Sequence, residues 1–126
     1  MFQGKDKPQK GLSGSAAEQM ALEFLQARGL TLSARNFRTR RGEIDLIMLD
    51  NKVLVFVEVR FRRSPDFGTA SASVTRRKQV KIISTARHFL LHNPKLAALP
   101  CRFDVVGITL AAQNITRFNW IQDAFC

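Results

Sequence analysis

Two acidic residues near the middle of the chain each lie among apolar neighbours. Asp45 lies in the segment Gly-Glu-Ile-Asp-Leu-Ile, and Glu58 follows the apolar run of residues 53–57. Two adjacent carboxylates in apolar surroundings are costly, because burial and like charge both disfavour the ionised form. A divalent cation would remove this conflict, and oxygen ligands at a partly open site suit Mg²⁺ or Mn²⁺. With Arg60 alongside, such a site could hydrolyse a phosphodiester through an activated water.

A β-hairpin is the element that must bring these two acids together. The turn-forming pair Asp50–Asn51 separates two strand-like segments, 43–49 and 52–61. With a two-residue turn at this pair, Asp45 and Glu58 share one face of the sheet, one diagonal step apart. A register shift of two residues keeps this arrangement, whereas a shift of one separates the acids.

A simpler alternative is a cross-strand set of ion pairs on the surface of the hairpin. Glu43, Asp45, Glu58 and Arg60 would form this set, as charged residues on exposed hairpins often do. Against it, Glu58 follows a run that is apolar on both faces at its start, which is typical of a central strand covered on both sides. An unpaired charge is costly there.

The rest of the pattern predicts one α/β domain over residues 13–126, preceded by a mobile basic tail over residues 1–12. Ser15 and Glu18 form a capping box for the first helix, and Gly29 suits its left-handed end. The second helix has an apolar stripe with Ile82 and Phe89 beside it, and the stripe consists of Val80, Ile83, Ala86 or Arg87, and Leu90. We expect the order αβββαββ, with a mixed sheet and a helix on each side of it. The predicted elements are helix 16–28, strands 30–37, 43–49 and 52–61, an exposed loop at 62–73, helix 74–92, and strands 102–110 and 114–121.

The net charge of the chain indicates what kind of partner it binds. The 126 residues carry a formal net charge of +10. Residues 35–87 hold thirteen basic and five acidic side chains, so the excess is local, which favours a binding face for a polyanion such as nucleic acid. The candidate phosphate contacts are Arg38, Arg40, Arg41, Arg62, Arg63, Arg76, Arg77, Lys78 and Lys81.

The same composition excludes other classes of protein. No apolar run is long enough to cross a membrane, and the N-terminus has no secretory signal. The two cysteines, Cys101 and Cys126, do not make a disulfide framework. We therefore expect a reduced, cytoplasmic protein without a membrane partner or a small-molecule cofactor.

Segments 42–47 (Gly-Glu-Ile-Asp-Leu-Ile) and 55–60 (Val-Phe-Val-Glu-Val-Arg) resemble the central motifs of the YraN-like family of bacterial proteins. That family is similar to Holliday-junction resolvases within the PD-(D/E)xK, or restriction-endonuclease-like, superfamily. The likeness covers roughly residues 11–126. Further matching segments are Ala17-Glu18, Phe24-Leu25, Gly29-Leu30, Arg35-Asn36 with Arg38, Phe67-Gly68, Lys78, residues 102–105 and Ala124-Phe125.

The resemblance implies a restriction-endonuclease-like fold and a role for each matching residue. Asp45 and Glu58 would be metal ligands, with the Val59 carbonyl as a third. Glu18 would be the first-helix acid that completes or supports the metal site. Arg60 stands where the superfamily usually has a lysine, and an arginine that stays protonated cannot act as a general base.

Two functions from different classes follow. The first is a Mg²⁺- or Mn²⁺-dependent DNA endonuclease, with a preference for branched or junction DNA that comes only from the resemblance, and with a homodimer as the form that would cut two strands. The second is a non-catalytic nucleic-acid-binding module that kept the fold and lost turnover, which Arg60 favours. A third, weaker alternative is a basic scaffold for protein partners.

Overall fold

The computed structural model describes residues 14–62, 74–110 and 115–125. The predicted tail at 1–12, most of the predicted loop at 62–73, Arg63 and Cys126 lie outside this range. The described elements are α1 (Gly14–Ala27), β1 (Thr31–Arg38), β2 (Glu43–Asp50), β3 (Val53–Arg62), α2 (Arg76–Leu91), α3 (Pro94–Ala97), β4 (Cys101–Leu110) and β5 (Thr116–Phe125).

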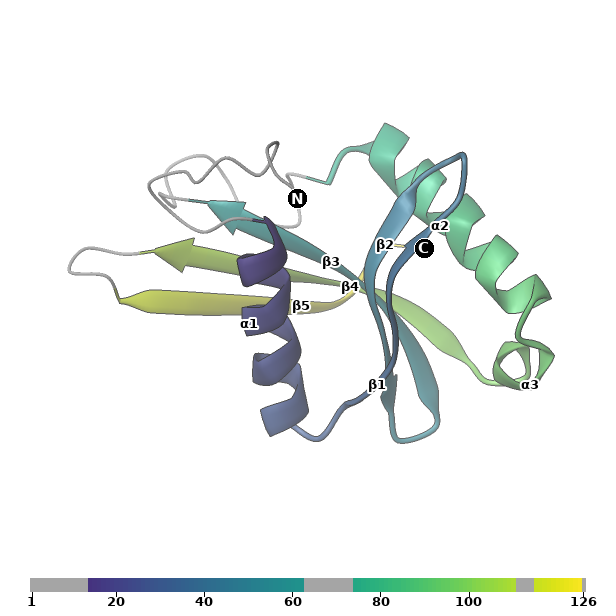
Figure 1. Cartoon of the computed structure of the whole chain (residues 1–126), viewed down its shortest axis with the longest axis horizontal. Helices are drawn as coiled ribbons and strands as arrows, with labels where there is room; N and C mark the ends of the chain where they lie inside the picture. Colours follow the sequence, from purple (N-terminus) through teal and green to yellow (C-terminus); the bar gives the residue numbers. More distant parts are fainter. Residues whose placement is uncertain (1–13, 63–73, 111–114, 126) are drawn as a thin grey trace.

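The five strands form one mixed sheet in the order β1-β2-β3-β4-β5, in which only β3 and β4 are parallel. The α2–α3 segment supplies the crossover that a parallel pair requires. As Figure 1 shows, α1 covers one face of the sheet, and α2 with α3 covers the other. The predicted α/β class and the predicted helix on each side are confirmed.

Each face of the sheet contributes its own half of the core. Leu46 and Val57 pack with α1 around Ala21 and Leu25, whereas Phe56 packs with α2. The predicted central position of β3 is confirmed, because residues 54–58 are buried and β3 pairs on both sides.

The ends of the first helix differ from the prediction at one end and agree at the other. The helix begins at Gly14, so Ser15 lies inside its first turn and is not the N-cap. Gly29 has a φ of +97°, the left-handed conformation expected of the residue that follows the helix.

The second helix also differs from the prediction in its buried stripe. Thr75 is its N-cap, because the Thr75 side chain accepts a hydrogen bond from the Lys78 backbone N–H at 3.2 Å. The buried residues are Ile82, Thr85, Ala86 and Phe89, whereas Val80 is 55% exposed. At 3.6 residues per turn, Val80 lies on the side of the helix opposite to these buried residues, which the spacing of large apolar residues did not reveal.

Candidate active site

In the β2–β3 hairpin, backbone pairing between the two strands stops just before Asp45 and Glu58. The turn is Asn51–Lys52, one residue later than predicted, with Asn51 at a φ of +58°. The register therefore differs from the predicted one by two residues, and the last pair of the ladder is Leu46 with Val57. The next residues on the two strands are Asp45 and Glu58, which lie close enough that the Asp45 charge raises the pKa of Glu58.

Where the backbone ladder stops, the Asp45 side chain bonds to the backbone of β3. Its Oδ2 atom accepts a hydrogen bond from the Val59 backbone N–H at 2.8 Å. Burial raises the pKa of Asp45, and so does the Glu43 charge, while the Val59 N–H opposes them by stabilising the charged form. Asp45 is thus held in one position beside β3.

Three carboxylates from two elements meet at this point. Glu18 of α1 and Glu43 and Asp45 of β2 each offer an oxygen atom within 4.8 Å of the others, and we call these three residues the acid cluster. Burial, then the charge of Asp45 and a hydrogen bond with it, raise the pKa of Glu18 to about 7. The positive charge of Arg35 opposes this shift.

Glu43 is the member of the acid cluster that was not predicted as a site residue. Its carboxylate also lies 3.2 Å from the Nε of Arg38, the last residue of β1, so it joins the acids to the basic end of that strand. The signal in the sequence was its position two residues before Asp45, which puts both on one face of a regular strand. The contact with Glu18 depends on where α1 packs, which that spacing does not specify.

Glu58 lies beside the acid cluster with two cations of its own. It is only 7% exposed, and its Oε2 atom lies 3.5 Å from Arg60 Nη1 and 3.6 Å from Lys78 Nζ. Burial and the Asp45 charge raise its pKa to about 7, and the Lys78 and Arg60 charges oppose that shift. Lys78 reaches β3 from the first turn of α2, so the amine comes from a different element than Arg60 does.

The predicted site residues therefore come together in two adjoining groups. Glu18 and Asp45 belong to the acid cluster, and Glu58, Arg60 and Lys78 form the second group. The Val59 backbone supplies a hydrogen-bond donor to Asp45. That the Val59 carbonyl is a metal ligand stays a prediction.

The family model described as "Uncharacterised protein family UPF0102" matches residues 17–108, which include the acid cluster, Glu58 and Lys78. The chain belongs to the UPF0102 family. A UPF0102 protein of Saccharophagus degradans is 55% identical over 90% of this chain and 92% of its own. One of Nitrosococcus oceani is 50% identical over 89% of this chain and 90% of its own. The YraN-like part of the resemblance is thereby confirmed.

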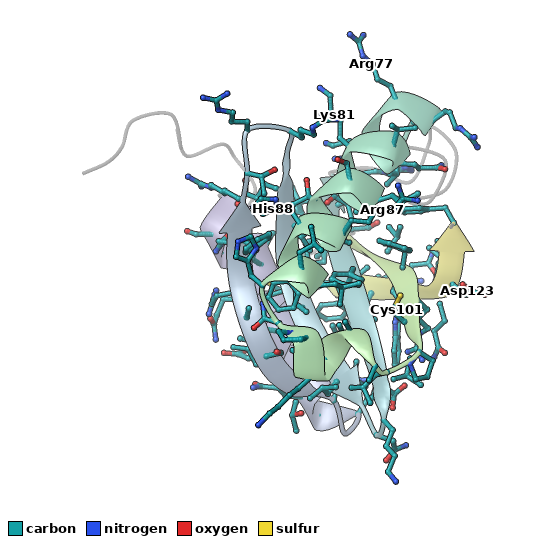
Figure 2. All side chains as sticks on the ribbon, turned by 90° about the vertical axis from the view of Figure 1, so that its right-hand side faces the viewer. Arg77, Lys81, Arg87, His88, Cys101 and Asp123 are labelled. Carbon is teal, nitrogen blue, oxygen red and sulfur yellow. The ribbon has the colours of Figure 1, made fainter. Side chains whose placement is uncertain are left out.

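Several basic side chains of this UPF0102 chain are exposed in the N-terminal half of α2. In Figure 2, Arg77 and Lys81 project outward from the N-terminal half of the helix, with His88 further along. A cavity of about 280 Å³ is lined by Thr75, Arg77, Lys78 and Lys81. Lys78 lines this cavity and also contacts Glu58, so the basic face adjoins the acids.

None of the helices in the described part of the chain is both long and apolar enough to span a membrane.

Proposed function

We propose that this protein is a divalent-metal-dependent endonuclease that hydrolyses phosphodiester bonds of DNA. The observation that carries the proposal is the acid cluster, in which three carboxylate oxygens from α1 and β2 lie within 4.8 Å of one another. Glu58, Lys78 and Arg60 adjoin it, so acids for a cation and bases for a phosphate occur side by side.

The acid cluster fits Mg²⁺ or Mn²⁺. All of its donors are carboxylate oxygens, which these hard cations prefer. Without a cation, burial and mutual repulsion raise the pKa of Glu18 and of Glu58 to about 7, so the fold holds carboxylates in surroundings that disfavour their charge. Glu18, Asp45 and Glu43 or Glu58 would hold the ion, with the Val59 carbonyl proposed as a further ligand. The ion would supply an activated water and stabilise charge on the phosphate.

The residues of the chain itself have separate tasks in this proposal. The Val59 N–H fixes the carboxylate of Asp45, so the ligand needs no reordering when the ion arrives. Arg60 stays protonated and stabilises negative charge that develops on the phosphate. Lys78 brings an ammonium group to the same place from α2 and orients a phosphate oxygen or the attacking water through its N–H donors.

DNA is the proposed substrate because of the basic surface beside the acids. The exposed basic residues are Arg40 and Arg41 between β1 and β2, and Arg76, Arg77 and Lys81 on α2. Each phosphate contact releases counterions, so binding should weaken steeply as salt rises. We also propose a preference for branched or junction DNA, as the likeness to resolvases implies, and a homodimer as the form that cuts two strands.

The second candidate function is nucleic-acid binding without turnover. Arg60 favours it, because a lysine in that place can give up a proton and an arginine cannot. In that case Asp45 and Glu58 would be structural remnants, and a cation would stabilise the fold without making the protein a nuclease.

One experiment separates these candidates. Single-stranded, duplex, forked and four-way-junction DNA are incubated with the wild type, Asp45→Asn and Glu58→Gln in Mg²⁺ or Mn²⁺, and affinity for the same DNA is measured in EDTA. The proposal expects cleavage by the wild type alone and binding by all three proteins. Binding without cleavage by any of them supports the binding module, and equal cleavage by all three points to contamination. The absence of any DNA affinity supports a scaffold for proteins.

A further inference from the structure

Residues 39–42, which we call the connector, form a tight turn between β1 and β2 that contacts α2. The Thr39 backbone N–H donates to the Gly42 carbonyl at 2.8 Å, and the Arg41 backbone N–H donates to Thr39 Oγ1 at 3.1 Å. Thr39 Oγ1 lies 3.5 Å from Oγ1 of the buried Thr85 on α2. These contacts leave Arg40 and Arg41 at the tip of the turn.

Gly42 packs closely where this turn meets the helix. A Cβ atom at position 42 would lie 3.2 Å from Thr85 Oγ1, which is closer than most such contacts, and 3.5 Å from Lys81 Cβ, which is an ordinary van der Waals distance. The absence of a side chain at Gly42 thus lets the connector pack directly on α2. Because the backbone of the turn is fixed in this way, its two arginines are presented at a low cost in conformational entropy.

A cavity of about 420 Å³ lies between the connector and α2, within the usual range of ligand sites. We call it the connector pocket, and it is lined by Arg38, Thr39, Arg40, Arg41, Ser84 and His88. Its lining offers three guanidinium groups, two hydroxyls and an imidazole, and it includes no acidic residue. Among the residues that the structure describes, neither Arg40 nor Arg41 has an acidic partner within 4 Å.

The connector pocket adjoins the acid cluster. Arg38 lines the pocket and contacts Glu43 at 3.2 Å, and Glu43 is a member of the acid cluster. On the other side, Lys81 lies against the connector and continues the positive charge toward Arg77 along the outer face of α2 (Figure 2). A ligand that follows this surface must carry negative charges at repeated intervals, as a nucleic-acid backbone does.

We propose that the connector pocket binds a backbone phosphate of a nucleic-acid strand, next to the phosphate that lies at the acid cluster. The protein then grips a strand over several nucleotides and not at the cut alone. The inference rests on the proposed function for the phosphate at the acid cluster, whereas binding of a strand in the pocket needs no cleavage. Arginine forks and hydroxyl donors are the groups that recognise phosphate oxygens.

The test measures binding in EDTA, so cleavage plays no part in it. Fluorescence anisotropy follows labelled oligonucleotides of increasing length with the wild type, with Arg40→Gln/Arg41→Gln, and with the control Lys52→Gln/Lys95→Gln. The control removes the same charge in the β2–β3 turn and on α3. We expect the pocket variant to bind the longer oligonucleotides about tenfold more weakly and to lower the slope of log affinity against log salt by roughly 1 to 2. The control should keep the slope of the wild type.

Equal affinities and equal salt slopes for the pocket variant and the control would overturn the inference. A second readout follows backbone amide shifts of Thr39, Arg41, Ser84 and His88 during titration with inorganic phosphate, a mononucleotide and an oligonucleotide. Tighter binding of the mononucleotide than of the oligonucleotide would also overturn it, in favour of a small-molecule pocket. If the pocket variant loses DNA affinity and no metal gives cleavage in the wild type, the endonuclease proposal fails and this inference stands.

Discussion

The carboxylate of Asp45 accepts a hydrogen bond from the backbone N–H of Val59 at 2.8 Å, just beyond the last backbone pair of the β2–β3 ladder. The Asp45 carboxylate of β2, and not a backbone carbonyl, is thus the acceptor for this N–H group of β3. This bond fixes Asp45 relative to Glu58 and Arg60, the two residues on either side of Val59. The position of Asp45 is therefore fixed by the sheet and does not depend on a loop.

Two substitutions at Asp45 should separate its charge from its hydrogen bond. In Asp45→Asn the amide oxygen can still accept from Val59, and the repulsion from Glu18 and Glu43 is gone, so we expect stability equal to that of the wild type or higher. Asp45→Ala leaves the Val59 N–H without its partner, which costs about 1–3 kcal/mol. Urea denaturation of the metal-free proteins measures the difference. Equal stability of the two variants would mean that this hydrogen bond contributes nothing.

The raised pKa of Glu58 makes the stability of the metal-free protein depend on pH. In the unfolded chain Glu58 loses its proton near pH 4.5, whereas in the folded protein it keeps the proton up to about pH 7. The folded state binds more protons between these values, so its stability falls as pH rises through them. We expect the melting temperature of the wild type, relative to that of Glu58→Gln, to decrease from pH 4.5 to pH 7. A difference that stays constant over this range would contradict the pKa shift.

Above pH 7, a bound cation should restore the stability that the metal-free protein loses as the pH rises. Ionised carboxylates bind Mg²⁺ or Mn²⁺ in the folded state, and a ligand that binds only the folded state stabilises it in proportion to the logarithm of its concentration. Thermal melting with increasing Mn²⁺ at pH 8 should show a rise for the wild type. The control is Lys52→Gln, far from the acid cluster, which should respond equally. Asp45→Asn should respond little, and an equal rise in that variant would remove Asp45 from the metal ligands.

Patterns within one element carried most of the correct predictions. The alternation around residues 43–49 and 52–61 predicted the hairpin, and the turn residues predicted its place to within one residue. The exact register depended on Asn51 taking a left-handed conformation, with a φ of +58°, which shifted the pairing by two. Because a shift of two keeps every side chain on its face, Asp45 and Glu58 still became neighbours.

Contacts between elements were harder to predict. Glu43 joins Glu18 only because α1 packs across β2, and Lys78 reaches Glu58 only because the crossover brings the start of α2 beside β3. Neither distance follows from the spacing of residues along one helix or strand. The basic residues in the first turns of α2 were predicted as phosphate contacts, and this role stays a prediction. Their charge did not indicate that one of them contacts an acid.

Asp104 has a structural role in the segment 102–105, which resembles the YraN-like family and lies away from the site. Its carboxylate is fully buried and accepts hydrogen bonds from Arg102 Nε at 3.0 Å, from Trp120 Nε1 at 2.9 Å and from the Asp123 backbone N–H at 2.9 Å. These bonds fasten β5 to β4 where their register shifts. Asp104→Ala removes the buried one of the two acidic partners of Arg102 and should cost about 3–5 kcal/mol. Asp50→Asn, which alters the more exposed contact of Arg102, is the control and should cost less in urea denaturation. A similar cost for both would argue against this clamp.

Lys78 provides the sharpest test of how the site would act on a phosphate. Lys78→Met removes the ammonium that lies 3.6 Å from Glu58, and Lys81→Met removes the same charge one turn along the same helix. If Lys78 stabilises the transition state, its loss should lower kcat by about 10²–10³-fold, while the loss of Lys81 should act mainly on KM through weaker binding. Lys78→Arg, which keeps the charge, should recover part of kcat. Independently of activity, NMR titration should find the Glu58 pKa raised above about 7 in Lys78→Met, because the Lys78 charge opposes that shift in the wild type. A raised pKa with kcat unchanged would leave Lys78 as a partner of Glu58 alone and would transfer the phosphate-orienting role to Arg60.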